Sequence, residues 1–273
     1  IYGGYESMDA KAINSADCLK VIAFVGAGYE NFVDVNAATR KGILVTNTPG
    51  ANTQSVAEMT IGLMLSCMRH IPYLNEGVRQ GKWNTSLEGS EIRGKVLGII
   101  GMGNIGKRVA EIAYYGFGMK IVYYSRTIKK EINEELAAEN LSLRDLLKVS
   151  DVVSLHLPYN PKVPETADLL SWNELGLMKR NAVLINTSRP EIVNGKALYE
   201  SLVGGSISAA AFDGYYTEPN PPTKGTDQYG LVSLPSEVFI VTPHNAWNTP
   251  EAAENMFMLA ANSVIDILNG RSN

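Results

Sequence analysis

The sequence is poor in the residues that usually bind metals. Its 273 residues include two cysteines and three histidines. Cys18 and Cys67 stand far apart and lack the spacing of a metal-binding motif, so we expect no zinc site and no metal cofactor. Two isolated cysteines fit a reducing compartment, from which we expect a cytoplasmic protein.

Long apolar runs and an excess of basic charge are lacking as well. The richest apolar stretch, residues 56 to 68, is interrupted by Glu58 and Thr60 and is shorter than the roughly 18 residues that cross a bilayer. The formal net charge is −4, so no basic field favours nucleic acid. We therefore expect neither a membrane nor a nucleic-acid partner. Hydrophobic residues make up 45%, enough for the core of a globular protein.

What the sequence does contain is a regular alternation of strand and helix patterns. Short β-rich runs fall at 20–25, 43–47, 97–100, 120–124, 151–157, 182–186, 207–212 and 238–241. Helical patterns fall at 53–70, with Ser55 as its cap, and at 105–115, 143–148, 196–203 and 250–268. Alternating strands and helices with short links predict an α/β protein with a doubly wound parallel sheet.

The alternation divides into two series, which predict two domains. Residues 74–249 suffice for a complete nucleotide-binding domain, and residues 1–73 with 250–273 would form a second, substrate-binding domain. The first series has too few strands to close a sheet, and the chain opens on Ile1 rather than on methionine. We therefore expect this N-terminal domain to be incomplete here, with a βαβ unit of roughly 30 residues or more preceding it.

A glycine-rich turn stands between the strand at 97–100 and the helix that follows. It reads Gly101-Met102-Gly103-Asn104-Ile105-Gly106, which matches G-x-G-x-x-G in the context that a dinucleotide site requires. Gly101 permits the tight turn, Gly103 leaves room for a pyrophosphate, and Gly106 lets the helix lie close to the strand. The backbone N–H groups of residues 103 to 106, including Asn104 and Ile105, would bind the pyrophosphate.

The end of the next strand would contact the adenosine ribose of the cofactor. NAD-binding enzymes place an acidic residue there, about 20 residues after the glycines, to hold the 2′-hydroxyl. This sequence has Ser125-Arg126-Thr127 instead. These side chains can donate to a 2′-phosphate, which predicts NADP(H) as the preferred cofactor with NAD(H) as the alternative. The other interpretation is that Arg126 is a solvated surface residue and either cofactor binds weakly.

Three further segments occur together and in order. They are Leu184-Ile185-Asn186-Thr187-Ser188-Arg189, then Ala211-Phe212-Asp213-Gly214-Tyr215-Tyr216-Thr217-Glu218-Pro219, then Val241-Thr242-Pro243-His244. With them the chain resembles the D-isomer-specific 2-hydroxyacid dehydrogenase family from its loop at residues 26–31 almost to the C-terminus. The Ser-Arg-Thr segment looks like that of the family's NADP(H)-preferring glyoxylate and hydroxypyruvate reductases. The resemblance implies two Rossmann-like domains with the active site in the cleft between them, and a homodimer.

The resemblance also implies the roles of three catalytic residues. Hydride attack on a keto carbon builds negative charge on the carbonyl oxygen, and a positioned histidine is suited to protonating it. That acid would be His244, and Glu218 would be the carboxylate that fixes its tautomer. Arg189 would bind the substrate's carboxylate or carbonyl by a charge-assisted bond. The substrate would be a small 2-keto or 2-hydroxy acid.

Further contacts follow from the same resemblance. The substrate carboxylate would be held by the backbone amides of Gly26, Ala27 and Gly28, together with Arg189 and His244. The remaining cofactor contacts would be made by His156, Pro158, Thr187 and Asp213. Asp213 would accept a hydrogen bond from the nicotinamide carboxamide. His156 ends a strand near the cofactor crevice, and a purely structural role is the alternative for it.

Two departures and two alternatives remain open. The family usually has glycine after the catalytic arginine, whereas this chain has Pro190, which lacks an N–H and fixes φ. The loop at 220–236 is longer than expected. One alternative function is an NAD-dependent 2-hydroxyacid dehydrogenase, such as a 3-phosphoglycerate dehydrogenase. The other is an NAD(P)-sensing protein of the corepressor type, because such proteins share this fold.

Overall fold

A computed structural model describes residues 1–3, 7–159 and 165–271. The chain forms two compact units. The first contains Ile1–Ser55 and Trp247–Asn273, and the second contains Val56–Tyr159 and Val163–Ala246. The helix α3 (Thr53–Met68) runs without a break across the division after Ser55. The predicted domain boundaries at residues 73 and 250 therefore stay a prediction.

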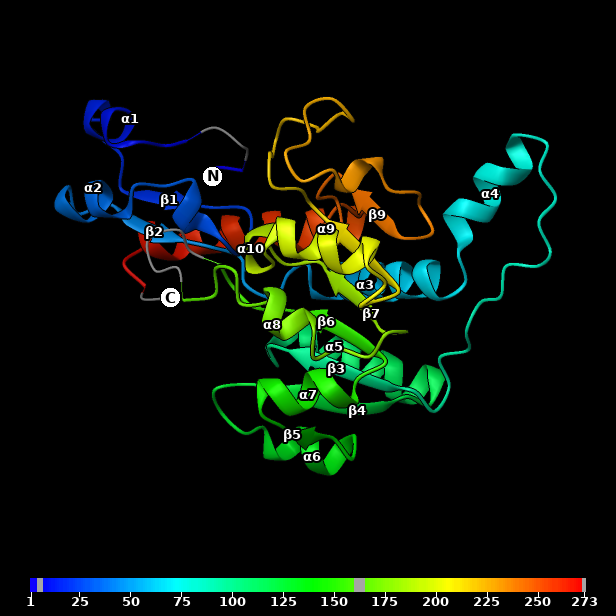
Figure 1. Cartoon of the computed structure of the whole chain (residues 1–273). Helices are drawn as coiled ribbons and strands as arrows, with labels where there is room; N and C mark the ends of the chain where they lie inside the picture. The colour runs from blue at the N-terminus through cyan, green and yellow to red at the C-terminus, as the bar shows by residue number, and fades with distance from the viewer. Residues whose placement is uncertain (4–6, 160–164, 272–273) are drawn as a thin grey trace. The chain divides into compact units, whose positions relative to one another are not determined.

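The second unit contains a parallel sheet of seven strands (Figure 1). In their order across the sheet, the strands are β5 (Glu139–Asn140), β4 (Lys120–Tyr124), β3 (Val96–Ile100), β6 (Val152–Leu155), β7 (Val183–Asn186), β8 (Ala209–Asp213) and β9 (Phe239–Thr242). The chain builds outward from β3 to β5 and then returns to β6 on the other side of β3. This reversal is the switch point of a doubly wound α/β sheet, so the predicted fold class is confirmed.

Helices cover both faces of this sheet, as the fully apolar strands predict. Because successive side chains of a strand point to opposite faces, Leu97 and Ile99 join one core and Ile100 joins the other. The first core receives the helix α3 and α5 (Asn104–Glu111), and the second receives α7 (Leu143–Val149) and α9 (Gly195–Val203). Because helices pack on both faces, the carboxyl ends of the strands are held in fixed positions relative to one another.

The shorter elements of the second unit complete the connections. They are α4 (Ile71–Arg79), the π-helical turn η2 (Ile112–Gly116), α6 (Lys130–Glu135), α8 (Trp172–Leu175), η3 (Pro190–Ile192) and η4 (Leu231–Ser233). The predicted helix at 53–70 ends two residues early, because His70 adopts a left-handed φ of 52° before α4 begins. Ser55 lies inside the first turn of α3 instead of capping it, and its hydroxyl pairs with Thr249 at 2.8 Å.

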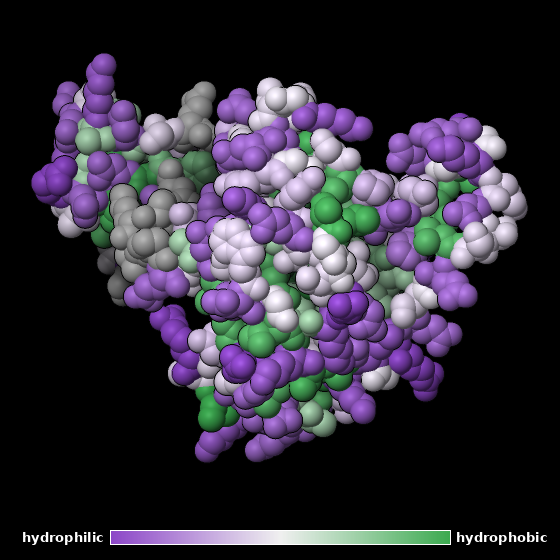
Figure 2. Space-filling model, in the orientation of Figure 1, coloured by the Kyte–Doolittle hydropathy of each residue, from purple (hydrophilic) through white to green (hydrophobic). Residues whose placement is uncertain are grey.

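The helix α4 projects from the rest of the second unit (Figure 1). Every one of its residues is at least partly exposed. Ile71 and Val78 are among the exposed large hydrophobic side chains, as is Trp83 just beyond the helix, with 81% of its surface accessible. Figure 2 shows apolar surface on this projection among hydrophilic atoms. The helix thus presents an apolar face that its own unit leaves open.

The first unit is smaller and contains two parallel strands, β1 (Val21–Ala23) and β2 (Leu44–Thr46). Its helical elements are α1 (Ala10–Ser15), η1 (Tyr29–Asn31), α2 (Val35–Arg40) and α10 (Pro250–Leu268). The helix α10 packs against β1, and the Thr249 side chain caps it by accepting from the Ala252 N–H. Both signals, a capping threonine and proline at the first helical position, are visible in the sequence.

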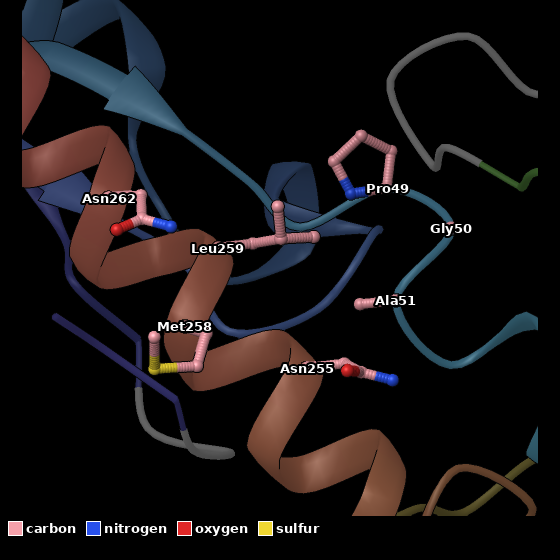
Figure 3. Close-up of a pocket in the computed structure, with 7 residues that line it drawn as sticks. All are labelled: Pro49, Gly50, Ala51, Asn255, Met258, Leu259 and Asn262. Carbon is pink, nitrogen blue, oxygen red and sulfur yellow. The ribbon is translucent and has the colours of Figure 1, made fainter.

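A shallow hollow of about 480 Å³ lies in this unit, between α10 and the loop after β2 (Figure 3). Its lining consists of Pro49, Gly50, Ala51, Asn255, Met258, Leu259 and Asn262. All these side chains are non-ionisable, so the hollow lacks groups for acid–base chemistry. Within the described residues, no helix could span a membrane and no cluster of potential metal ligands occurs.

Candidate active site

The predicted site residues of the second unit follow five neighbouring strands at one edge of the sheet. Gly101 follows β3, His156 follows β6, Arg189 comes after β7, Asp213 ends β8 and His244 comes after β9. Since all seven strands are parallel, their carboxyl ends meet at this edge, where doubly wound sheets bind ligands. The structure thus brings residues more than 140 positions apart to a common edge.

The glycine-rich turn has the geometry of a dinucleotide cradle. Gly101 has a φ of 102°, and a Cβ there would stand 2.4 Å from the His156 carbonyl oxygen. A Cβ on Gly106 would stand 2.2 Å from the Gly101 carbonyl oxygen. At Gly103, by contrast, a Cβ would meet only open space among the described residues. Gly103 also precedes the first turn of α5, whose amides face this space, so the residues fit a pyrophosphate.

The segment after β4 is accessible, as a ribose-phosphate site requires. Ser125 is half-buried, and Arg126 and Thr127 are exposed. Among the described residues the guanidinium of Arg126 has no hydrogen-bond or ion-pair partner. The segment is anchored beyond these residues, where the Lys129 N–H donates to the Tyr123 hydroxyl at 2.8 Å. The Arg126 side chain is therefore available to an anionic ligand.

The three predicted catalytic residues lie in one hydrogen-bonded row. His244 Nδ1 is 2.7 Å from Glu218 Oε2, and His244 Nε2 is 3.1 Å from an Arg189 guanidinium nitrogen. Arginine can only donate, so Nε2 accepts and the ring carries its proton on Nδ1. That proton is donated to Glu218. The row therefore holds a neutral histidine whose Nε2 lone pair faces the arginine.

The Glu218 carboxylate is held as an anion. Burial alone would raise its pKa, but the hydrogen bond from His244, the Tyr215 N–H and the charge of Arg189 together lower it. The Tyr215 N–H donates to Glu218 Oε1 at 2.7 Å. Gly214 makes this approach feasible, because its φ is 119° and a Cβ there would stand 2.2 Å from Oε1. An ionised Glu218 stabilises a proton on the histidine ring.

The turn that carries His244 is held by Asp213, which is 2% exposed. Its carboxylate accepts from the Thr242 hydroxyl at 2.6 Å and from the N–H groups of Asn245 and Ala246 at 3.0 and 2.8 Å. These bonds bracket His244, which has a left-handed φ of 54°. The structure thus gives Asp213 a role inside the protein, and its predicted contact with the nicotinamide stays a prediction.

The loop that carries Arg189 is also braced from within. The Asn186 side chain donates to the Arg189 carbonyl oxygen and accepts from the Ser188 N–H. Pro190 begins η3, where a missing N–H costs nothing, and it favours the extended backbone observed at Arg189. Thr187 is half-buried, and its hydroxyl lies 2.9 Å from that of Thr60 on α3.

The long loop after Glu218 is pinned to the same segment. The Tyr215 hydroxyl donates to Asp227 at 2.6 Å, and burial together with this bond raises the tyrosine's pKa. Asp227 also accepts from the N–H groups of Tyr229 and Val232 at 3.1 and 2.9 Å. Tyr215 therefore anchors the loop through its hydroxyl, and its backbone N–H holds the Glu218 carboxylate.

His156 and Pro158 follow β6 at the same edge. His156 Nε2 lies 2.8 Å from the hydroxyl of the buried Ser154, and burial lowers the histidine's pKa to about 3. His156 is thus uncharged at neutral pH. Pro158 is exposed, and its carbonyl oxygen accepts from the Thr166 hydroxyl. The cofactor contacts predicted for these two residues stay predictions.

The predicted carboxylate clamp belongs to the first unit. The Gly26 N–H already donates to the Thr48 hydroxyl at 2.9 Å, and the Asn47 side chain donates to the Ala27 carbonyl oxygen at 2.8 Å. Among the described residues, the N–H groups of Ala27 and Gly28 lack an acceptor. These two amides are therefore the ones open to an anion, and the clamp itself stays a prediction.

Known proteins resemble this chain over most of its length. Residues 61–246 match the model for the NAD-binding domain of D-isomer specific 2-hydroxyacid dehydrogenases. A glyoxylate reductase of Aeropyrum pernix is 40% identical, and the match covers 97% of this chain and 78% of that protein. A D-3-phosphoglycerate dehydrogenase of Methanocaldococcus jannaschii is 39% identical over 94% of this chain and 47% of its own length. The TT0316 protein of Thermus thermophilus superposes with a TM-score of 0.86 at 37% identity, over 99% of this chain and 82% of that one.

The fold, the glycine turn and the histidine–carboxylate row define a dinucleotide-dependent oxidoreductase that acts on a CH–OH group. Within that class, the chain belongs to the D-isomer specific 2-hydroxyacid dehydrogenase family, which confirms the resemblance seen in its sequence.

His156 gives the site a pH dependence that stability measurements can detect. Its folded pKa of about 3 lies below the ordinary value of 6.5, so the unfolded chain binds more protons in between. The stabilisation is complete above pH 6.5 and is lost as the pH falls toward 3, at up to about 1.4 kcal/mol per pH unit. The free energies of unfolding of the native chain and of His156→Gln, measured in urea, should therefore converge by that amount per pH unit between about pH 6 and 4.

The control is Asn75→Gln, which exchanges two neutral side chains at an exposed position of α4. Its difference from the native chain should stay constant across these pH values, because neither side chain titrates. Parallel curves for His156→Gln as well would show that His156 ionises normally in the folded protein.

Proposed function

We propose that this enzyme reduces glyoxylate and related small 2-keto acids with NADPH. The observation that carries the proposal is the row in which His244 lies between the Glu218 carboxylate and the Arg189 guanidinium. A proton-transfer group and an anion-binding group placed side by side suit a substrate whose carbonyl is next to a carboxylate. The similarity to a glyoxylate reductase over nearly the whole chain supports the same substrate class.

The protein's own residues would bind the acid and relay a proton to it, whereas the hydride comes from the cofactor. When bound, a reduced nicotinamide would supply that hydride to the carbonyl carbon. Arg189 would donate to the substrate and thereby release His244 Nε2, to which it donates in the structure. Nε2 would then take up a proton from solvent and pass it to the carbonyl oxygen. Glu218 stabilises the charged ring before that transfer and holds the neutral ring afterwards.

In the direction of oxidation, the observed proton arrangement is already suitable. The Nε2 lone pair can accept the proton of a 2-hydroxy acid, and the Nδ1 proton remains with Glu218. The same row therefore serves both directions, because only the Nε2 proton is exchanged. The substrate's carboxylate would be bound by Arg189, which lies in the same row as His244.

A second candidate is an NAD-dependent dehydrogenase that acts on 3-phosphoglycerate. The observation favouring it is the 39% identity to a D-3-phosphoglycerate dehydrogenase, of which this chain spans about half the length. The absence of an acidic side chain at residues 125–127 weighs against NAD. A cofactor-sensing role would be favoured by cofactor binding without turnover of any acid.

The first prediction concerns turnover. The native chain should oxidise NADPH in the presence of glyoxylate or hydroxypyruvate, as followed by the loss of reduced-nicotinamide absorbance. His244→Ala removes the proton donor and should lower kcat by about 10²- to 10⁴-fold, since general acid catalysis contributes that much. The dissociation constant of NADPH should hardly change, because His244 would contact the substrate and not the cofactor.

Controls separate this outcome from a general loss of structure. His70→Asn should turn over like the native chain, and Glu218→Gln should fall between it and His244→Ala. Native protein that binds NADPH but reduces none of glyoxylate, hydroxypyruvate, pyruvate and bulkier 2-keto acids would contradict the proposal.

The preference for NADPH is a separate prediction that rests on Arg126. The exposed guanidinium can pair with a 2′-phosphate, so Arg126→Asp should weaken NADPH binding by about 10-fold or more while NADH binding changes little. Arg144→Asp makes the same charge change at an exposed position of α7 and serves as the control. Equal binding of both cofactors by the native chain, or an equal loss for both in Arg126→Asp, would sink this assignment.

We further propose a homodimer in which a second copy covers the apolar face of α4, formed by Ile71, Val78 and the nearby Trp83. Sedimentation velocity should then give a dimer at micromolar concentration. Val78→Glu should shift it toward monomer, whereas Gln80→Glu, at the exposed C-cap on the opposite side of the helix, should not. A monomeric native protein would exclude the dimer.

A cytoplasmic location stays a prediction from cysteine content.

A further inference from the structure

Thr60 is a buried hydroxyl residue with no part in the row of catalytic side chains. It lies on α3 and is 2% exposed, and its hydroxyl oxygen is 2.9 Å from that of Thr187. Thr187 follows β7, is half-buried, and stands two residues before Arg189 at the carboxyl edge of the sheet. A buried hydroxyl therefore pairs with a hydroxyl that a ligand at this edge could reach.

The direction of this hydrogen bond follows from counting protons. The Thr60 oxygen also lies 2.8 Å from the Val56 carbonyl oxygen, which can only accept. Thr60 must therefore give its single proton to Val56. In the pair with Thr187, it follows that Thr60 accepts and Thr187 donates. The proton of Thr187 is thereby committed inward, and its outward lone pairs leave it as an acceptor only.

We propose that Thr60 is a positioning residue that fixes Thr187 as a hydrogen-bond acceptor for the nicotinamide half of the cofactor. This rests on the proposed function, because it requires a dinucleotide at the sheet edge. A dinucleotide whose pyrophosphate lies at the turn after β3 must reach the row at His244, and β7 lies between these two points. The donors in that half are the carboxamide amino group and the ribose hydroxyls.

The polarity has a chemical consequence for the reaction. An acceptor at Thr187 takes the amino group of a carboxamide and not its oxygen, so it distinguishes the two ends of that group. Were the Thr187 proton free to turn outward, the site would lose this distinction. Thr60 acts at a distance from the cofactor, through the orientation of one O–H bond.

The experiment compares Thr60→Val, which removes the acceptor at nearly constant volume, with Thr60→Ser, which keeps it. We expect Thr60→Val to raise the dissociation constant of NADPH about 3- to 10-fold, since one net hydrogen bond is worth that factor. Thr60→Ser should bind like the native chain. Cofactor fluorescence gives both values, and the native chain's own binding and turnover test the proposed function separately.

A second cofactor distinguishes the two donors. In the 3-acetylpyridine analogue of NADPH a methyl group replaces the amino group. If the amino group is the donor, Thr60→Val should leave binding of the analogue unchanged, and if a ribose hydroxyl is the donor, it should weaken both cofactors equally. Either pattern supports the proposal, whereas unchanged binding of both cofactors by Thr60→Val would overturn it.

Thr187→Val, measured by itself, does not depend on the folding of Thr60→Val, and with the double variant it completes a double-mutant cycle. It removes the acceptor itself and should weaken NADPH binding at least as much. If Thr60 acts through Thr187, the double variant should bind like Thr187→Val alone. Full additivity of the two effects, or native-like binding by Thr187→Val, would refute the positioning role and leave Thr60 as a packing residue.

Discussion

The hydrogen bond between His244 Nδ1 and Glu218 is the constraint around which this edge of the sheet is arranged. It is 2.7 Å long and joins two loops that follow β8 and β9. Bringing the side chains together requires two unusual backbone conformations, a φ of 119° at Gly214 and of 54° at His244. A left-handed non-glycine residue costs about 1–3 kcal/mol. The three bonds accepted by the buried Asp213 carboxylate hold the His244 turn in that conformation.

The same arrangement controls where protons reside. Each group at this edge can be assigned a direction because its neighbour has only one option: arginine donates, carboxylates and carbonyls accept, and a hydroxyl has a single proton. This reasoning places the ring proton on Nδ1 of His244 and directs the Thr187 proton toward Thr60. A ligand therefore meets an edge whose polarity is already set by residues beneath it. Preorganised polarity of this kind favours one orientation of a bound molecule.

Much of this could be predicted from the sequence, for physical reasons that differ between elements. The strand at 120–124 and the helix at 250–268 were predicted to the residue, since a buried parallel strand is a continuous apolar run and Thr249-Pro250 is a strong helix start. The helix α4 was not predicted, because no buried residue marks its face. The capping role of Ser55 was predicted wrongly, as its partner Thr249 is 194 residues away.

The residues of the candidate site also differ in whether the sequence could reveal them. The family resemblance implied roles for Arg189, Glu218 and His244, and the structure brings these three residues together. Thr60 was missed because its partner is 127 residues away in the chain. The partners of Asp213, at residues 242 to 246, were likewise hidden, although the residue itself was singled out. Local patterns reveal which groups a site contains, whereas the direction of each hydrogen bond depends on contacts that only folding creates.

In the proposed mechanism, the contact between Arg189 and His244 would link substrate binding to proton uptake. In the structure the Arg189 guanidinium donates to Nε2 and so occupies the lone pair that a proton would need. An anionic acid that drew the guanidinium to itself would free that lone pair for a proton from solvent. Nε2 is the atom from which the proposed mechanism passes a proton to the carbonyl oxygen. The acid would thereby open its own proton donor, with Glu218 holding the Nδ1 side of the ring.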